Sequence, residues 1–106
     1  MTRPALTFGL AALIRALAVK AGHRPVVEDI RSTPWSSITF TGMRHCFALR
    51  FEGERAKAAA DALSKGLDYT EFDLRRYILV DIAIVESEVR GDYARLAIEA
   101  LILAND

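Results

Sequence analysis

The most regular pattern of apolar and polar residues in the chain runs from Phe72 to Leu103. The even-numbered positions from 72 to 84 are apolar except Arg76, which is the period of a β-strand with one buried face. Arg90-Gly91-Asp92 then offers a three-residue turn, because Gly91 adopts positive φ without strain. With this loop the sequence predicts a hairpin with four pairs: Val89 with Tyr93, Ile84 with Ile98, Ile82 with Ala100 and Val80 with Ile102.

The second half of this hairpin has an alternative interpretation. Residues 94–103 are good helix formers, and Asp92 could cap a helix there. The match between their even-numbered apolar residues and those of the preceding run favours a strand instead. The hairpin then has an apolar face, which includes Ile78 and Val80, and a mixed face. The first strand contributes these residues to the mixed face: Tyr77, Leu79, Asp81, Ala83 and Val85.

Apolar residues at helical spacing cover the first part of the chain, Met1–Gly22. One stripe consists of leucines: Leu6, Leu10, Leu13 and Leu17. Pro4 suits a first helical turn and Gly22 suits a helix end. The basic start and Ala16-Leu17-Ala18 are also typical of a secretory signal with its cleavage site. Because Arg15 interrupts the apolar run, we interpret the segment as a structural helix and expect no association with membranes.

The middle of the chain predicts short strands. Val26–Arg31 has the composition of an edge strand, and Ser32-Thr33-Pro34 would end it. Trp35–Thr41 and Met43–Phe51 then form a hairpin that turns at Thr41-Gly42. In this hairpin Phe40 lies opposite Met43, Ile38 opposite His45 and Ser36 opposite Phe47. The alternative is a single strand with a bulge at Gly42. We favour the hairpin. Both versions place the same residues on the core face: Met43, His45, Phe47, Leu49 and Phe51.

A second helix is predicted over Gly53–Lys65, because its alanines and Leu63 follow helical spacing. Gly66 suits a left-handed helix end. The element order is therefore α-β-β-(β)-α-β-β, an α-β-β unit used twice. Two helices on the apolar face of one antiparallel sheet form an α+β two-layer sandwich, and 106 residues suffice for a single domain, 1–106.

Composition indicates the cellular compartment more clearly than it indicates the function. The single cysteine, Cys46, rules out an internal disulfide and suits a reducing, cytoplasmic location. The net charge is zero, but residues 1–51 hold seven basic and two acidic residues, whereas residues 52–106 hold seven basic and twelve acidic ones. We interpret this asymmetry as attraction between the two halves of one fold, with association between copies or a basic face as alternatives.

No motif for a cofactor, a metal or nucleic acid is found. The glycines lack phosphate-loop spacing, and the few His and Cys residues lack metal-ligand spacing, so we expect neither cofactor nor metal. His45 and Cys46 point to opposite faces of a strand and therefore cannot bond each other there as a nucleophile–base pair, which favours a structural histidine and an inert thiol. Arg75-Arg76-Tyr77 is too small a cluster for a nucleic-acid surface. Arg90-Gly91-Asp92 matches the integrin-binding tripeptide, but a turn explains it.

The mixed face of the sheet is the main candidate for function. We expect Arg44, Cys46, Ala48 and Arg50 on it from the central strand. Three hypotheses compete: a homodimer or protein interface, a pocket in which Arg44 and Arg50 hold an anion, and an enzyme with Asp81 or Glu99 as base. We favour association over catalysis. The candidate binding residues on this face are Arg44, Arg50, Tyr77, Asp81, Arg95 and Glu99.

Overall fold

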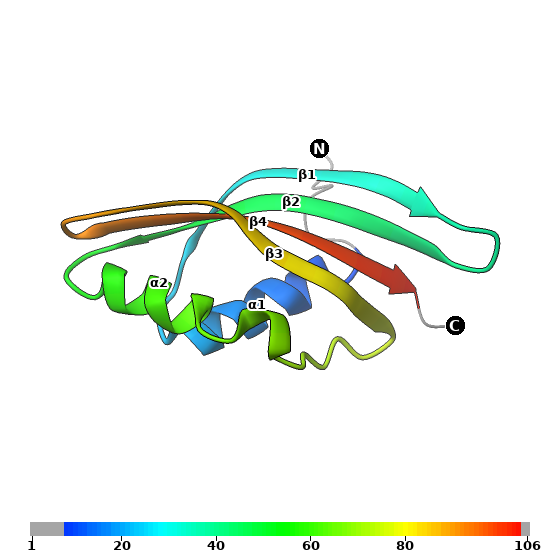
Figure 1. Cartoon of the computed structure of the whole chain (residues 1–106), viewed down its shortest axis with the longest axis horizontal. Helices are drawn as coiled ribbons and strands as arrows, with labels where there is room; N and C mark the ends of the chain where they lie inside the picture. The colour runs from blue at the N-terminus through cyan, green and yellow to red at the C-terminus, as the bar shows by residue number, and fades with distance from the viewer. Residues whose placement is uncertain (1–7, 105–106) are drawn as a thin grey trace.

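A computed structural model describes residues 8–104 and contains two α-helices packed on one face of a four-stranded antiparallel sheet (Figure 1). The elements are α1 (Leu10–Ala21), β1 (Val26–Ser36), β2 (Thr41–Glu52), α2 (Ala56–Ser64), the short 3-10 helix η2 (Leu67–Tyr69), β3 (Tyr77–Arg90) and β4 (Tyr93–Ala104). The predicted α+β sandwich is confirmed, without the optional fifth strand. No helix within residues 8–104 is long and apolar enough to span a bilayer.

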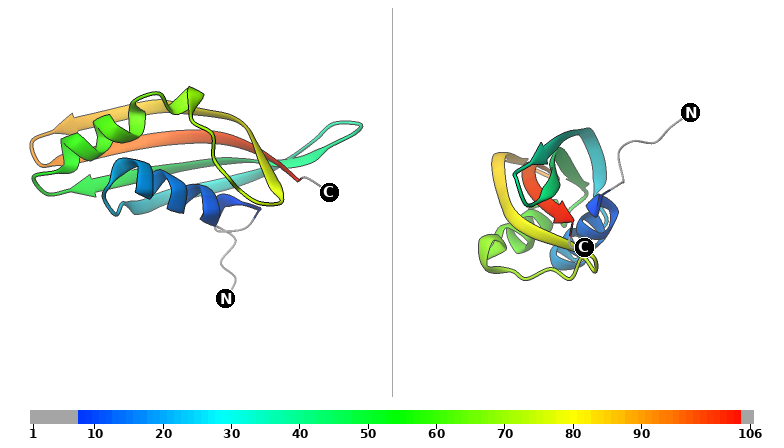
Figure 2. Two further views of the ribbon diagram at one scale, coloured as in Figure 1. Left: turned by 90° about the horizontal axis from the view of Figure 1, so that it is seen from below. Right: turned by 90° about the vertical axis from the view of Figure 1, so that its right-hand side faces the viewer.

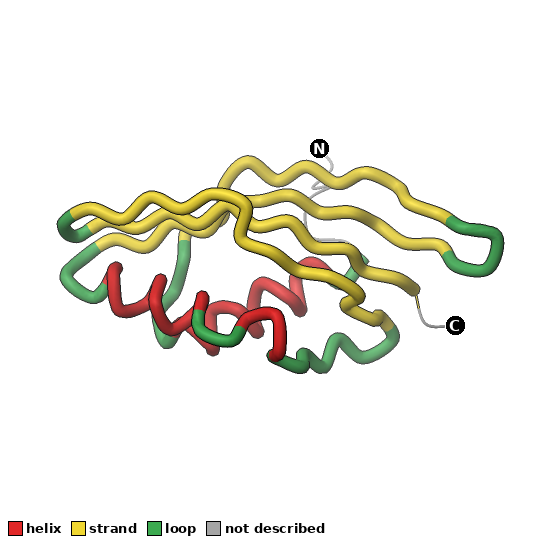
Figure 3. Tube along the Cα trace, viewed as in Figure 1, coloured by secondary structure: helices red, strands yellow, loops and turns green. Residues whose placement is uncertain are grey.

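The strand order is β1-β2-β4-β3, so the two hairpins meet through their inner strands. Figure 2 shows both helices in front of the sheet when the molecule is seen from below, and Figure 3 shows the opposite face without any helix. The inner strands alternate as predicted. On the side of the helices β2 buries His45, Phe47, Leu49 and Phe51, and β4 buries Ala94, Leu96, Ile98, Ala100 and Ile102. Residues 93–104 therefore form a strand and not a helix.

The leucine stripe of α1 packs into the core as its spacing predicted. Leu10, Leu13 and Leu17 are completely buried. The helix ends at Gly22, which has a φ of 70° and donates its N–H to the carbonyls of two residues in the last turn. The predicted start at Pro4 and the first leucine of the stripe, Leu6, lie outside the described residues.

The alanine stripe of α2 allows this helix to lie close to the sheet and to α1. Ala56, Ala59 and Ala60 are all buried, and the helix is shorter at both ends than predicted. Lys20, in the last turn of α1, donates from Nζ to the carbonyl oxygen of Ala62 at 2.6 Å and also to that of Lys65. A cation at the carbonyl end of a helix is favourable, so this contact fastens the two helices together.

The predicted register of the β3–β4 hairpin is correct in its middle and wrong at both ends. Ile84 pairs with Ile98 and Ile82 with Ala100, as expected. Arg90 rather than Val89 pairs with Tyr93, so only Gly91-Asp92 forms the loop, and Leu79 rather than Val80 pairs with Ile102. Two irregularities in β3, at residues 80 and 85, insert one residue each and reverse which side chains face the helices.

The β1–β2 hairpin also differs from the prediction. β1 continues through Ser32-Thr33-Pro34 to Ser36, and the turn consists of residues 37–40 instead of Thr41-Gly42. Met43 therefore pairs with Pro34, not with Phe40. His45 likewise pairs with Ser32 and not with Ile38, and neither Gly42 alternative holds. Pro34 is tolerated because β1 is an edge strand, where a missing N–H disrupts no ladder on the outer side.

Gly42 lies inside β2 because two strands approach closely there. A Cβ built at this position would lie 2.5 Å from Cδ2 of Leu103 and 2.7 Å from the carbonyl oxygen of Ile102. We expect Gly42→Ala to lower the free energy of unfolding by about 1–2 kcal/mol, because the backbone oxygen cannot move aside as a side chain can. Urea unfolding of both proteins checks this. Gly53→Ala is not a suitable control, because Gly53 has a φ of 105°, which alanine rarely adopts. Ser36→Ala, at an exposed strand end, is a suitable control.

Candidate functional site

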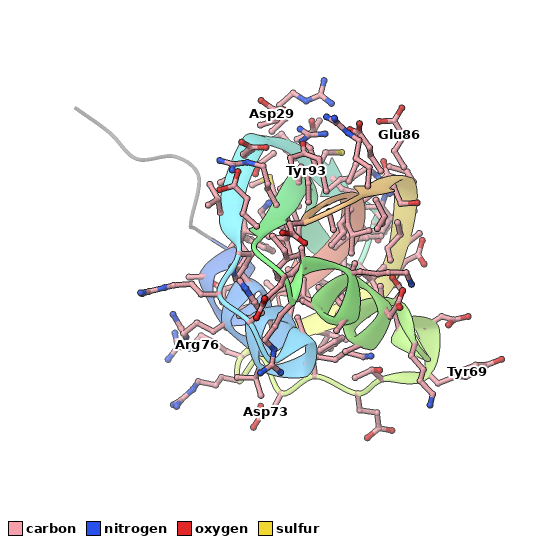
Figure 4. All side chains as sticks on the ribbon, turned by 90° about the vertical axis from the view of Figure 1, so that its left-hand side faces the viewer. Asp29, Tyr69, Asp73, Arg76, Glu86 and Tyr93 are labelled. Carbon is pink, nitrogen blue, oxygen red and sulfur yellow. The ribbon has the colours of Figure 1, made fainter. Side chains whose placement is uncertain are left out.

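The candidate site is the face of the sheet opposite the helices, here called the open face. Cross-strand pairing arranges its side chains in rows that run from β1 through β2 and β4 to β3. One row consists of Arg31, Cys46, Glu99 and Ala83; the next consists of Glu28, Ala48, Ala97 and Glu86. In Figure 4 the labelled residues Asp29, Glu86 and Tyr93 lie on this side, whereas Tyr69, Asp73 and Arg76 lie on the side of the helices.

The centre of the open face is small and apolar. Ala48 and Ala97 are direct partners on the two inner strands, and Ala48 is only 2% exposed. Leu101, one of the next open-face residues of β4, is 8% exposed. The small alanine side chains leave an open hollow of about 550 Å³, which residues of all four strands line and to which β1, β3 and β4 contribute charged side chains. The centre of the open face is therefore already partly shielded from solvent in the single chain.

A cluster of ion pairs closes one end of this hollow. The carboxylate of Glu28 accepts hydrogen bonds from Nε of Arg50 at 2.9 Å and from Nε of Arg95 at 3.0 Å. These two bonds hold the pKa of Glu28 below its usual value, and the bond to Glu28 raises the pKa of Arg50. Arg50 also pairs with Glu52. The cluster therefore spans three strands and fixes both arginines in place.

Asp29 joins this cluster through the irregularity in β1. Its φ of 55° is a left-handed conformation that aspartate tolerates better than most residues, and it lies where the β1–β2 register shifts. Its carboxylate reaches Nη2 of Arg95 at 2.6 Å. The bulge thus directs a second acid of β1 onto β4, and Arg95 bonds to two carboxylates at once.

Cys46 and Glu99 lie side by side near the middle of the face. The thiol Sγ is 3.7 Å from Oε2 of Glu99, and Nη1 of Arg44 is 3.8 Å from Oε1 of the same carboxylate. Burial, followed by the negative charge of Glu99, raises the pKa of the Cys46 thiol. A thiol that keeps its proton is a poor nucleophile, so this pair has no evident reactivity.

Five of the six residues predicted for this surface lie on the open face: Arg44, Arg50, Asp81, Arg95 and Glu99. Arg44 and Arg50 are six residues apart on one strand, a separation of about 20 Å, so they do not converge on one small ligand. Asp81 is exposed and forms no ion pair among the described residues. Its carboxylate has none of the burial that we expected of a base.

Tyr77 is not on the open face, which corrects the sequence prediction. Its ring packs on the ring of Phe8 with the centroids 5.0 Å apart, and it joins the core on the side of the helices. The extra residue at position 80 explains the change, because it reverses the faces of all β3 residues before it. Leu79 packs against the core for the same reason, while Ile78 and Val80 are exposed.

The sequence did not identify four charged residues of the site: Glu28, Asp29, Arg31 and Glu86. Arg31 and Glu86 have no ion-pair partner within residues 8–104, and they lie on the two edge strands, on opposite sides of the hollow. No local motif marks these residues. Only the strand order, which places β1 beside β2 and β3 beside β4, brings them to one surface.

His45 lies on the other face of β2 and is completely buried. Ser32 donates its hydroxyl hydrogen to Nδ1 over 2.7 Å, and the Nε2–H donates to the carbonyl oxygen of Phe8 over 3.3 Å. Burial lowers the pKa of His45, and the bond to Phe8 offsets only part of this. Both ring nitrogens are therefore used in holding β1 and the start of α1 to the sheet, which is a structural role.

Within residues 8–104, no three His, Cys, Asp or Glu side chains are grouped as a metal ion would require. The open face is thus described by its apolar floor and its ion pairs. Comparison with known proteins adds no further assignment, because no protein-family model and no curated protein sequence matches this chain.

Proposed function

We propose that this protein is a homodimerisation module in which two copies pack their open faces against each other. The observation that carries the proposal combines two nearly buried apolar residues at the centre of the face, Ala48 and Leu101, with charges of opposite sign on the two edge strands that have no ion-pair partner within residues 8–104. An apolar centre with a charged rim is the composition of a protein interface. A second copy supplies both the cover for the floor and the missing partners for the charges.

The size of the open face suits a stable dimer. Four strands about 4.8 Å apart, each about eleven residues long at about 3.3 Å per residue, give roughly 700 Å² per copy. Typical protein interfaces bury about 800 Å² per partner. Pairing through the edges of the sheet is a poorer alternative, because β1 and β3 are both interrupted by bulges, which prevent a regular ladder with another strand.

The unpaired charges favour a two-fold axis parallel to the strands. Such an axis lays β1 of one copy over β3 of the other, so Arg31 faces the row position of Ala83, between Asp81 and Glu86. Glu28, whose charge Arg50 and Arg95 already neutralise, then faces Glu86. An axis across the strands would lay β3 over β3 instead, and the acids would face their own copies. Opposite charges attract and like charges repel across the roughly 10 Å between packed sheets, so the first arrangement is preferred.

Charge reversal tests this arrangement. We expect Arg31→Glu to weaken dimerisation about tenfold or more, measured by sedimentation equilibrium, because each dimer loses two attractive contacts and gains two repulsive ones. The double variant Asp81→Arg/Glu86→Arg should weaken it for the same reason. Mixing the two variants should restore a heterodimer, since the reversed charges are again complementary.

Arg15→Glu, on the exposed side of α1, is the matched control and should leave dimerisation unchanged. A wild-type protein that stays monomeric at high micromolar concentration overturns the proposal. Dimerisation that persists in all variants would exclude the open face as the interface. Recovery in the mixture is the decisive result, because loss of folding in either variant cannot produce it.

Anion binding by Arg44 and Arg50 receives less support than dimerisation. Arg50 bonds to Glu28 and Glu52, and Arg44 lies beside Glu99, so much of their charge is neutralised within the chain. The separation between them also prevents a joint grip on a small anion.

A further inference from the structure

The β1–β2 hairpin extends beyond the rest of the molecule and carries an unusual surface. Figures 1 and 2 show its tip projecting past both helices and past the end of β4. Residues 32–43, which form the tip, are the longest stretch of the chain without a charged residue. At its apex Ile38 is fully exposed, and Phe40 is 47% exposed. Nothing within residues 8–104 covers these two side chains.

Both faces of the tip carry apolar side chains, interspersed with the serines and threonines that make up half of residues 32–43. Trp35 pairs with Gly42 and so lies on the open face, whereas Pro34 and Met43 pair on the opposite face. A peptide that binds in a protein groove is usually apolar on one face and polar on the other. A segment with apolar side chains on both faces, and only uncharged hydroxyls between them, suits immersion in an apolar medium that has polar groups at its edge.

The turn pairs three of its backbone N–H groups internally. The N–H of Ser37 donates to the carbonyl oxygen of Phe40 at 2.8 Å. The Ser37 hydroxyl oxygen accepts from the N–H of Phe40 at 3.0 Å and from that of Thr39 at 3.3 Å. Backbone groups left unpaired in lipid are costly, so these three bonds lower the cost of moving the turn out of water.

We infer that this hairpin tip inserts into the boundary between headgroups and acyl chains of a lipid bilayer. Trp35 lies three residues before Ile38, about 10 Å from the apex, which matches the depth of peripheral insertion and the preference of tryptophan for the interface. The first charged residues on the two strands are both arginines, Arg31 and Arg44, and Arg44 is the nearer in the ladder. Arginine at this level suits contact with lipid phosphates.

Co-sedimentation of the full 106-residue chain with vesicles tests the inference. We expect binding to phosphatidylcholine vesicles, and somewhat stronger binding when phosphatidylserine is included. Emission of Trp35, the single tryptophan, should shift to shorter wavelength on binding. Ile38→Asp/Phe40→Asp should weaken binding at least tenfold, because it places two charges in the apolar region.

Val19→Asp is the matched control, since Val19 is an equally apolar exposed residue on α1, away from the tip. It should bind like the wild type, and all variants should retain the circular dichroism spectrum and the oligomeric state. A wild type that stays in the supernatant with both kinds of vesicle overturns the inference and leaves the tip to a protein partner. Equal losses in Val19→Asp and Ile38→Asp/Phe40→Asp overturn it as well. The dimer is measured separately and does not depend on this outcome.

Discussion

Ala97→Arg is expected to abolish dimerisation at concentrations where the wild type is fully dimeric. Ala97 and its partner Ala48 form the floor of the hollow, at the centre of the proposed interface. A long charged side chain there would separate the two faces or be buried without a partner, which costs several kcal/mol. Because about 1.4 kcal/mol corresponds to a tenfold change, we expect the dissociation constant to rise more than a hundredfold.

The fold of the monomer should survive this substitution, because the side chain at 97 points away from the helices and the core. Ala58→Arg, on the exposed side of α2, is the matched control for adding an arginine in place of an alanine. Sedimentation equilibrium and the thermal midpoint should be measured for both. A folded Ala97→Arg protein that dimerises as tightly as the wild type would show that the floor is not covered by a second copy.

The sequence predicted the inner strands well because nothing interrupts their alternation. β2 and β4 pair without a shift from Gly42 to Glu52, so odd residues of one and even residues of the other face the helices throughout. β3 was predicted well only between its two irregularities. Val80 and Val85 look like ordinary strand residues, and a bulge there depends on twist and packing of the whole sheet, which a local pattern does not contain.

The hairpin turn was misplaced because Gly42 has two possible roles. A glycine after threonine predicts a turn from local preferences. In the structure Gly42 is needed because Leu103 and the carbonyl of Ile102 approach it from β4, a contact between residues far apart in sequence. In the structure the turn is held by hydrogen bonds to the Ser37 side chain. The apolar residues beside this turn follow the pattern of a strand, so the sequence did not mark them as part of a turn.

The sequence predicted which face of the sheet carries the site, but not which side chains of that face contact one another. Arg44, Arg50, Arg95 and Glu99 followed from alternation in the two inner strands. Glu28 meets Arg95 only because β4 lies beside β2 and a short distance from β1, and strand order cannot be obtained from periodicity.

The two proposals are compatible in their geometry. A two-fold axis parallel to the strands keeps both copies pointing in the same direction, so both hairpin tips would extend from one end of the dimer. Two tips that reach one bilayer together bind more tightly than one, because the second insertion becomes intramolecular. We therefore expect Ala97→Arg to weaken vesicle binding indirectly, without changing the tip or its two arginines.

His45→Ala is expected to lower the free energy of unfolding by about 3 kcal/mol at neutral pH and to remove a sensitivity to acid. The substitution leaves a cavity in the core and removes the partners of the Ser32 hydroxyl and the Phe8 carbonyl. In the wild type, burial lowers the pKa of His45 below its ordinary value of 6.5. The unfolded chain therefore binds a proton that the folded chain resists, and acidification favours unfolding.

Because acidification is expected to favour unfolding, the free energy of unfolding has to be measured as a function of pH. Stability should be constant above about pH 7.5 and fall by up to about 1.4 kcal/mol for each pH unit below 6.5, until the folded state also accepts the proton. Urea unfolding between about pH 7.5 and pH 5.5 avoids most carboxylate titration. His45→Ala should start from a lower stability and give a slope shallower than the wild-type slope. If His45→Ala keeps that slope, another group causes the acid sensitivity and His45 is not held neutral by its two bonds.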